Sequence, residues 1–195
     1  MLKVERRRTT KETDVELKVD FDGSGRSEST TNLPFLDHLL TSLAKHGRFD
    51  MDLKVKGDLE VDDHHVVEDV AITLGEALDE ARQRRVAVRR FGSAVVPMDD
   101  ALVMVAVDLG GRSYLAASLK FGRKMIGSFS LSNVKHFLRS LSDAGKLNLH
   151  VRLISGEDDH HIAEAIFKGL GLSLRQALEE DPRLAGGVPS TKGSI

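Results

Sequence analysis

The sequence contains no cysteine, no tryptophan and a single tyrosine among its 195 residues. The absence of cysteine excludes disulfides, thiolate zinc sites and iron–sulfur clusters, and it fits the reducing cytoplasm in which we expect the protein to reside. The scarcity of large aromatic side chains weighs against stacking of sugars or bases. No apolar run approaches the roughly 18 residues that a membrane span needs, and the basic residues 1–10 lack the apolar core of a secretory signal.

An excess of charge of one sign is missing as well. Charged residues make up 30% of the chain, yet the formal net charge is only −2. No overall field therefore directs the protein toward nucleic acid or an anionic membrane, and we expect neither as a partner. With 41% hydrophobic residues, the chain is long enough for a substantial core, as one domain or two half-domains.

One short motif, Asp-His-His-x-x-Glu, occurs twice, at residues 63–68 and 159–164. Each copy opens an apolar stretch whose spacing predicts a helix. Positions i and i+4 share a helix face, so the first histidine and the glutamate of each copy can chelate one ion. The second histidine points about 100° away, so each helix is predicted to contact two metals. The ligands predicted from the two copies are His64, His65, Glu68, His160, His161 and Glu164.

A simpler interpretation is that Asp63 and Asp159 cap the two helices. Capping explains the aspartates, but it explains neither the adjacent histidines nor the glutamate at i+4. Two adjacent histidines would repel each other if charged, and metal ligation in the neutral form removes that repulsion. The motif therefore favours metal binding.

The similarity of the two halves extends beyond this motif. The aligned segments are residues 15–21 with 103–109, 37–43 with 135–141, and 49–55 with 147–153. Each half is predicted to be a β-β-β-α-β-α unit, whose first helix starts near Pro34 in one half and near Ser130 in the other, with Ser132 as an alternative cap. We predict an α+β fold with an internal duplication, in which two four-stranded sheets are each backed by two helices.

The repeats are predicted to span residues 1–92 and 93–180, followed by a tail at 181–195, and together to form one pseudo-twofold domain. The alignment pairs His38 with His136, so six of the eight histidines fall into three matched pairs. His46 and His150 have no counterpart, and we do not expect them to bind metal.

Six imidazoles and two carboxylates suit two ions. We predict that one ion takes His64, Glu68, one of the pair His38 and His136, and a histidine from the other His-His pair, while the duplicate set holds the other ion. Such ligands suit Mn²⁺, Fe²⁺ or Zn²⁺ and leave positions open for a substrate. A closed structural zinc site would stop at about four ligands and commonly use cysteine. Asp69 stands where the inverted zinc-protease motif needs histidine, which disfavours a protease.

Several cations suggest an anionic substrate. Arg112 follows two glycines, Arg90 precedes Phe91, and Lys168 comes four residues after the second motif glutamate, while residues 189–193 offer hydroxyls and a lysine. Together they would form a phosphate cradle. Each also has a simpler interpretation, because Arg90 belongs to a basic run and a chain end is commonly frayed.

Seven separated motifs occur in a characteristic order. They lie at residues 8–13, 35–40, 62–69, 97–101, 136–137, 159–168 and 189–193. In these motifs the chain resembles, over essentially its full length, the imidazoleglycerol-phosphate dehydratase family. The resemblance implies a ribosomal protein S5 domain 2-like fold. It also implies a hydro-lyase of histidine biosynthesis that converts imidazoleglycerol phosphate, a small phosphorylated molecule, to imidazole acetol phosphate.

The resemblance further implies two Mn²⁺ per active site, held by the eight ligands above. It implies a homo-oligomer of 24 chains built from trimers, with active sites shared between subunits. Glu12, whose counterpart in the second half is Asp100, is the implied acid/base. The implied phosphate-binding residues are Arg90, Arg112, Lys168, Ser190 and Lys192.

Two alternatives fit the same residues. One is a metal-dependent hydrolase that cleaves a phosphoester with a bridging hydroxide. The other is a metal-buffering or structural assembly whose ions are closed off from substrate. Release of inorganic phosphate distinguishes the first alternative, and bound metal without substrate binding distinguishes the second.

Overall fold

The two halves of the chain build two sheets with the same strand order. The computed structural model describes residues 1–195 except 86, 185–186, 188 and 191–195. The first half contains β1 (Lys3–Thr9), β2 (Thr13–Asp20), β3 (Ser27–Thr30), α1 (Pro34–Gly47), β4 (Asp50–Gly57) and α2 (His64–Arg84). The second half contains β5 (Phe91–Met98), β6 (Ala101–Asp108), β7 (Tyr114–Ser118), β8 (Met125–Ile126), β9 (Phe129–Ser130), α3 (Ser132–Ala144), β10 (Asn148–Ser155), α4 (Asp159–Leu178) and a short 3₁₀ helix (Pro182–Leu184).

The sheet orders are β1-β2-β4-β3 and β5-β6-β10-β7. In each sheet the last strand runs parallel to its neighbour, and the other neighbouring strands are antiparallel. The predicted duplication of an α+β unit is thus confirmed. Within the described residues, no helix combines the length and apolar character that crossing a membrane requires.

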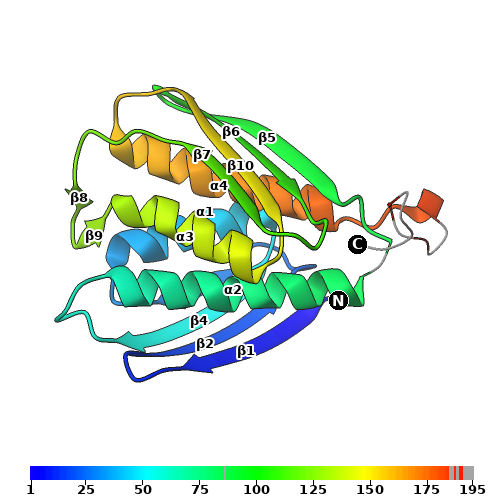
Figure 1. The fold of residues 1–195 in the computed structure, drawn as a ribbon, viewed down its shortest axis with the longest axis horizontal. Helices are drawn as coiled ribbons and strands as arrows, with labels where there is room; N and C mark the ends of the chain where they lie inside the picture. The colour runs from blue at the N-terminus through cyan, green and yellow to red at the C-terminus, as the bar shows by residue number, and fades with distance from the viewer. Residues whose placement is uncertain (86, 185–186, 188, 191–195) are drawn as a thin grey trace.

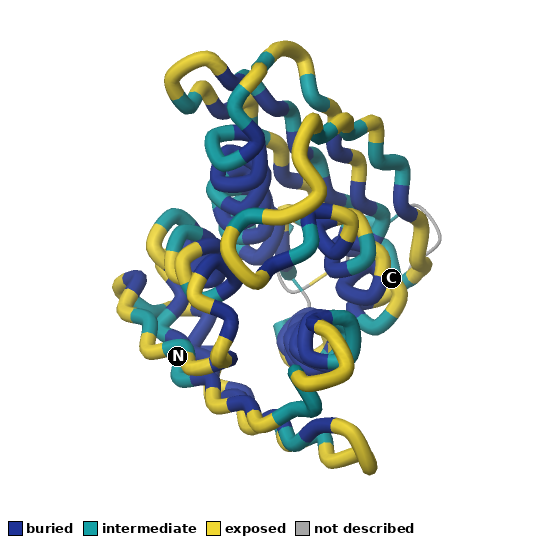
Figure 2. Tube along the Cα trace, turned by 90° about the vertical axis from the view of Figure 1, so that its left-hand side faces the viewer, coloured by how far each residue is buried: buried dark blue, intermediate teal, exposed yellow. Residues whose placement is uncertain are grey.

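The sheets form two outer layers with the four helices between them (Figure 1). α2 covers β1 and β2, and α4 covers β5 and β6. The strands alternate between buried and exposed residues along their length (Figure 2), because successive side chains of a strand point to opposite faces. In β2, for example, Val15, Leu17 and Val19 face the helices and are at most 3% exposed.

Helices of opposite halves lie side by side, α1 along α4 and α2 along α3. Gly171 permits the first of these contacts, since a Cβ atom there would lie 2.3 Å from the backbone oxygen of Leu43. Gly75 permits the contact between α2 and α3, since a Cβ atom there would lie 2.8 Å from the backbone nitrogen of Gly145. The core is therefore shared between the halves.

The second half has an insertion, the β8–β9 hairpin between β7 and α3, which the first half lacks. For this reason α3 begins at Ser132, while Ser130 ends strand β9. The helix thus starts near Ser130, as predicted, but Leu131 rather than a serine stands at its N-cap. The amide and hydroxyl of Ser130 donate instead to the Asp63 carboxylate, at 2.6 and 2.9 Å.

The aspartates of the two motifs do not cap their helices through their side chains. The capping bonds come from the preceding residues, since the Asp62 and Asp158 carboxylates accept from the amides of His64 and His160, at 2.8 and 2.7 Å. Asp159 accepts from the amides of residues 122 and 123. Asp159 and Asp63 thus fasten the two ends of the insertion, and the capping interpretation is wrong for both.

Candidate metal centre

Six of the predicted ligands form two triads. One triad is His64, Glu68 and His136, and the other is His160, Glu164 and His38; in each triad the candidate ligand atoms lie within 4.8 Å of one another. The i, i+4 pair of each triad comes from the start of α2 or α4, as the motif predicts. The third histidine comes from the helix packed alongside, which belongs to the other half. The structure thus places His136, rather than His38, beside His64.

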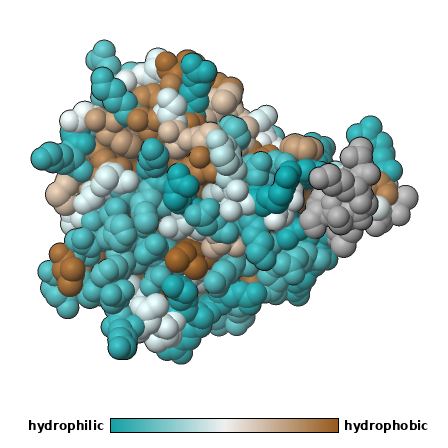
Figure 3. Space-filling view, in the orientation of Figure 1, coloured by the Kyte–Doolittle hydropathy of each residue, from teal (hydrophilic) through white to brown (hydrophobic). Residues whose placement is uncertain are grey.

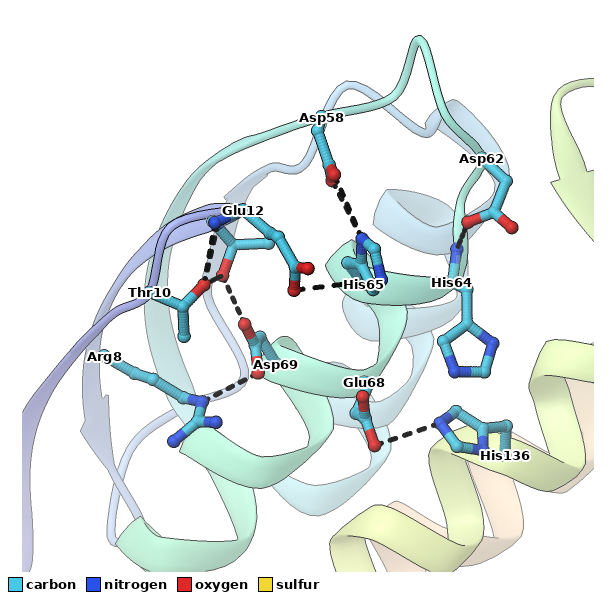
Figure 4. A network of polar contacts seen from close by, with 11 residues as sticks. Arg8, Thr10, Glu12, Asp58, Asp62, His64, His65, Glu68, Asp69 and His136 are labelled. Carbon is cyan, nitrogen blue, oxygen red and sulfur yellow. Dashed lines mark hydrogen bonds and ion pairs between the residues drawn. The ribbon is translucent and has the colours of Figure 1, made fainter.

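The distances within the triads are short. His38 Nε2 lies 3.1 Å and His160 Nε2 lies 3.3 Å from the same Glu164 oxygen. In the other triad, His136 Nε2 lies 3.4 Å from Glu68 Oε1 (Figure 4). Each triad therefore offers two nitrogen donors and one oxygen donor that converge on one point.

The donor atoms of the first triad fit a divalent cation. His136 Nε2 is buried and has no hydrogen-bond partner among the residues that the structure describes. Leaving a buried polar atom unpaired is unfavourable, and a cation bound there would satisfy it. Imidazole and carboxylate donors suit Mn²⁺, Fe²⁺ and Zn²⁺.

A lysine side chain lies beside the second triad. Lys168 Nζ lies 2.9 Å from Glu164 Oε1, and the lysine side chain is 18% exposed. Burial raises the pKa of Glu164, but the hydrogen bonds from Lys168 and His38 outweigh it and lower this pKa to about 2. Glu164 is thus an anionic donor at neutral pH, and Lys168 lies beside it at the metal-binding end of α4.

His65 and His161 lie in neither triad of the single chain, although each is oriented as a metal ligand would be. Asp58 lies 3.0 Å from His65 Nδ1 (Figure 4), and Asp100 lies 2.7 Å from His161 Nδ1. Hydrogen bonding to these carboxylates raises the pKa of both histidines. A carboxylate on Nδ1 fixes the ring and leaves Nε2 free to bind a metal.

Glu12 and its counterpart Asp100 have different surroundings. The Asp100 carboxylate accepts hydrogen bonds from His161 and from the amides of Glu157 and Asp158, which hold its pKa well below the usual range. The Glu12 side chain is 53% exposed, and one carboxylate oxygen lies 3.8 Å from His65 Nε2 (Figure 4). Asp100 thus stabilises a loop, while Glu12 faces the free nitrogen of a candidate ligand.

The other predicted phosphate-binding residues lie elsewhere. Arg90 donates to Asp108 at 2.7 Å and to the Pro189 carbonyl at 3.0 Å, which brings this part of the tail against it. Arg112 is exposed in the β6–β7 turn, and Ser190 is half-buried. Lys192 lies outside the described residues, as does part of the predicted tail 181–195.

Arg90 and Arg112 are at the far end of the second sheet from the triads. β5 starts beside Arg90 and runs for 8 residues, roughly 26 Å, to the turn that holds Asp100 against the start of α4. Figure 1 shows the same separation, since α2 and α4 begin at the end opposite to the chain termini. A single chain therefore does not bring its own Arg90 and Arg112 to its own triads.

The fold and the site define a class of protein, a duplicated α+β chain with two His-His-Glu triads between its halves, each of which could hold a metal ion. The family model for imidazoleglycerol-phosphate dehydratase matches residues 31–174. The protein of that name from Desulforudis audaxviator is 49% identical over 193 residues, covering 99% of this chain and 97% of the relative. The chloroplastic imidazoleglycerol-phosphate dehydratase 1 of Arabidopsis thaliana is 44% identical, over 97% of this chain and 70% of the relative.

Solved structures agree with these relatives. The crystal structure of imidazoleglycerol-phosphate dehydratase from Staphylococcus aureus superposes with a TM-score of 0.82 at 31% identity, covering 91% of this chain and 98% of that one. The crystal structure of IGPD from Pyrococcus furiosus in complex with (S)-C348 gives a TM-score of 0.83 at 40% identity, covering 97% and 100%. This chain belongs to the imidazoleglycerol-phosphate dehydratase family.

Proposed function

We propose that the protein is a cytoplasmic, metal-dependent hydro-lyase of histidine biosynthesis, which removes water from imidazoleglycerol phosphate to give imidazole acetol phosphate. Family membership supports this activity. The observation that carries it is the pair of triads, with the unpaired His136 nitrogen buried in one of them. These donors are what a chemistry dependent on divalent metal needs.

Each triad would hold one Mn²⁺, and Fe²⁺ or Zn²⁺ suits the same donors. A bound ion supplies Lewis acidity, which polarises the substrate and favours loss of its hydroxyl. His65 and His161 would each provide a further nitrogen. Since neither lies in a triad of its own chain, we propose that they complete the triads of neighbouring subunits.

The phosphate-binding residues support the same conclusion. Arg90 and Arg112 lie far from the triads of their own chain. We propose that they bind a phosphate next to the metals of another copy, together with Ser190 and Lys192 of the tail. Lys168 is placed to reach the substrate from the metal-binding end. A complete active site would therefore need more than one chain, which supports a homo-oligomer. The assembly that we propose is the one that the family resemblance implies, 24 chains built from trimers.

The outer faces of the two sheets differ in a way that supports assembly. On the second sheet, Phe91, Val95, Tyr114 and Ile154 are 52–59% exposed. On the first sheet, the outward residues of β2 include Glu16 and Lys18. Apolar residues also gather over the upper part of the molecule in Figure 3, where the second sheet lies. Large exposed apolar patches mark interaction surfaces, and we propose a second copy of this chain as the occupant.

Glu12 is the proposed acid/base. Its carboxylate is not fixed by backbone amides as that of Asp100 is, and it lies 3.8 Å from the nitrogen that His65 would offer to a metal. The dehydration breaks a C–H and a C–O bond and releases the hydroxyl as water. The Glu12 carboxylate would accept the proton from carbon and pass it to the departing hydroxyl, which leaves as water. The enol that remains gives the ketone when its O–H proton moves to carbon.

The test is an assay of the purified protein with Mn²⁺ and imidazoleglycerol phosphate, with quantification of both imidazole acetol phosphate and inorganic phosphate. We expect the ketone product and no inorganic phosphate. Release of phosphate at the rate of substrate loss would instead identify a hydrolase.

A pair of variants tests the ligand assignment. His65→Asn should lower metal content and abolish turnover, because it removes a proposed ligand. His150→Asn should leave both near wild type, since His150 lies exposed on β10 with its ring 5.9 Å from that of Tyr114. Equal behaviour of the two variants would refute the assignment.

A further inference from the structure

We propose that Asp69 is a positioning residue, which holds the turn that carries Glu12 in register with the metal-binding helix. This inference rests on the proposed function, in which Glu12 is the acid/base. Asp69 directly follows the ligand Glu68 on α2 and is 5% exposed. One turn of α2 would thus fix both a metal ligand and the catalytic carboxylate.

The contacts form a chain from Asp69 to Glu12 (Figure 4). One Asp69 oxygen accepts from Arg8 Nε at 2.7 Å, and the other accepts from the Thr13 hydroxyl. The Thr13 hydroxyl also lies 3.3 Å from that of Thr10. Thr10 Oγ1 accepts from the backbone amides of Glu12 and Thr13, at 3.1 and 3.0 Å. The backbone on both sides of the turn is therefore linked to α2.

The second half of the molecule provides an internal comparison. Arg8 pairs with Val15 across β1 and β2, as Val96 pairs with Val103 across β5 and β6. By the same alignment, Ala101 corresponds to Thr13 and Ala165 to Asp69. Val96, Ala101 and Ala165 are 8%, 1% and 0% exposed. The second half thus has buried apolar residues where the first half has a partly buried ionic network, in which the Arg8 side chain is 34% exposed.

This comparison indicates that the polar residues of the first half serve function rather than stability. A buried ion pair is commonly no more stabilising than apolar residues of similar volume, and the second half shows that the fold accepts the apolar set. The polar set occurs only in the half that carries Glu12. Its counterpart Asp100 does not depend on such a network, because backbone amides bind its carboxylate directly. Positioning of Glu12 accounts for the difference between the halves.

The first test compares two buried aspartates of α2. Asp69→Asn should lower kcat by about 10- to 100-fold, because a displacement of about 1 Å at a reacting group has an effect of this size. KM and metal content should stay near wild type. Asp79→Asn is the matched control, since Asp79 is 7% exposed and binds Arg82 and Lys146, away from the turn. It should lower the melting temperature and leave kcat unchanged.

A second test separates hydrogen bonding from packing at Thr13. Thr13→Ser keeps the hydroxyl, and Thr13→Val keeps the shape. If the hydroxyl positions Glu12, the serine variant retains most of kcat and the valine variant loses it. A valine variant with the higher kcat would overturn the proposal, as would loss of metal in Asp69→Asn.

The triple variant R8V/T13A/D69A installs the residue set of the second half. It should fold and bind metal like wild type but turn over as slowly as Asp69→Asn. A triple variant with wild-type kcat would overturn the positioning role. Failure of the proposed function is distinguishable, because wild-type protein would then form no imidazole acetol phosphate at all.

Discussion

Replacing His136 by leucine should stabilise the protein when metal is absent. The reason is the buried Nε2 atom of His136, which lies 3.4 Å from Glu68 Oε1 but makes no hydrogen bond to it or to any other described residue. An unsatisfied buried polar group is unfavourable by about 1–3 kcal/mol, and leucine removes it. Leucine also loses the contact with the His64 ring, whose centroid lies 4.2 Å from that of His136, a contact worth about 0.5–1.5 kcal/mol. The net gain is about 1 kcal/mol.

Bound metal should make wild type more stable than the His136→Leu variant. At a metal concentration of about 100 times Kd, a bound ion stabilises the folded state by about 2.7 kcal/mol. The leucine variant lacks one donor of the first triad and should lose much of this gain. For a chain of 195 residues, 1 kcal/mol corresponds to roughly 2–4 °C in melting temperature. The variant should melt higher than wild type in chelator and lower in Mn²⁺.

The assay is thermal unfolding followed by circular dichroism at about pH 8, where an ordinary imidazole is neutral. His38→Leu is the matched control from the other triad. Its Nε2 is hydrogen-bonded to Glu164 at 3.1 Å, so its removal should give no stabilisation in chelator. The reasoning is refuted if His136→Leu melts below wild type in chelator, or if the two leucine variants shift alike.

Three further predictions follow from the contacts. Asp100→Asn weakens the bond that orients His161 and should lower metal affinity by about 10- to 100-fold in calorimetric titration; unchanged affinity would contradict it. Burial raises the pKa of Asp79, but hydrogen bonds, chiefly from Lys146, lower it below 3.8. Its stabilisation is therefore present above about pH 4 and lost on acidification, so the difference in unfolding free energy between wild type and Asp79→Asn should shrink from pH ~5 to ~3. Gly171→Val should destabilise the protein by about 3 kcal/mol in denaturant titration, because its Cβ would meet the backbone of α1 at 2.3 Å; an unchanged midpoint would argue against a tight crossing.

The sequence was informative about the fold wherever the determining interactions are local. Apolar spacing after residues 63 and 159 predicts α2 and α4, and Pro34 predicts the start of α1, which the structure confirms. The duplication could also be predicted, because two aligned halves tend to fold alike. The alignment of the two halves does not predict the β8–β9 hairpin, because the first half has no corresponding segment.

The candidate site could be predicted less completely. The i, i+4 pairs follow from helical geometry, but the choice of His136 for the first triad depends on how α3 packs against α2. That packing depends on long-range contacts such as the one at Gly75, which spacing does not report. Asp58 and Asp69 were also missed as partners. Their signal is weak, since an aspartate after a strand or a glutamate is most simply solvated.

The exchange of the third histidine between the halves has an evolutionary consequence. Each triad combines a His-Glu pair from one half with a histidine from the other, so one half-length chain holds no complete triad. A half-length ancestor with these histidines could bind metal in this way only as a symmetric pair of chains. Joining two such chains into one turns an interface between two molecules into the interior of one. Two joined copies need not stay identical, and here only the first half has a glutamate, Glu12, in a turn with threonines, while the second half has Asp100 at that position.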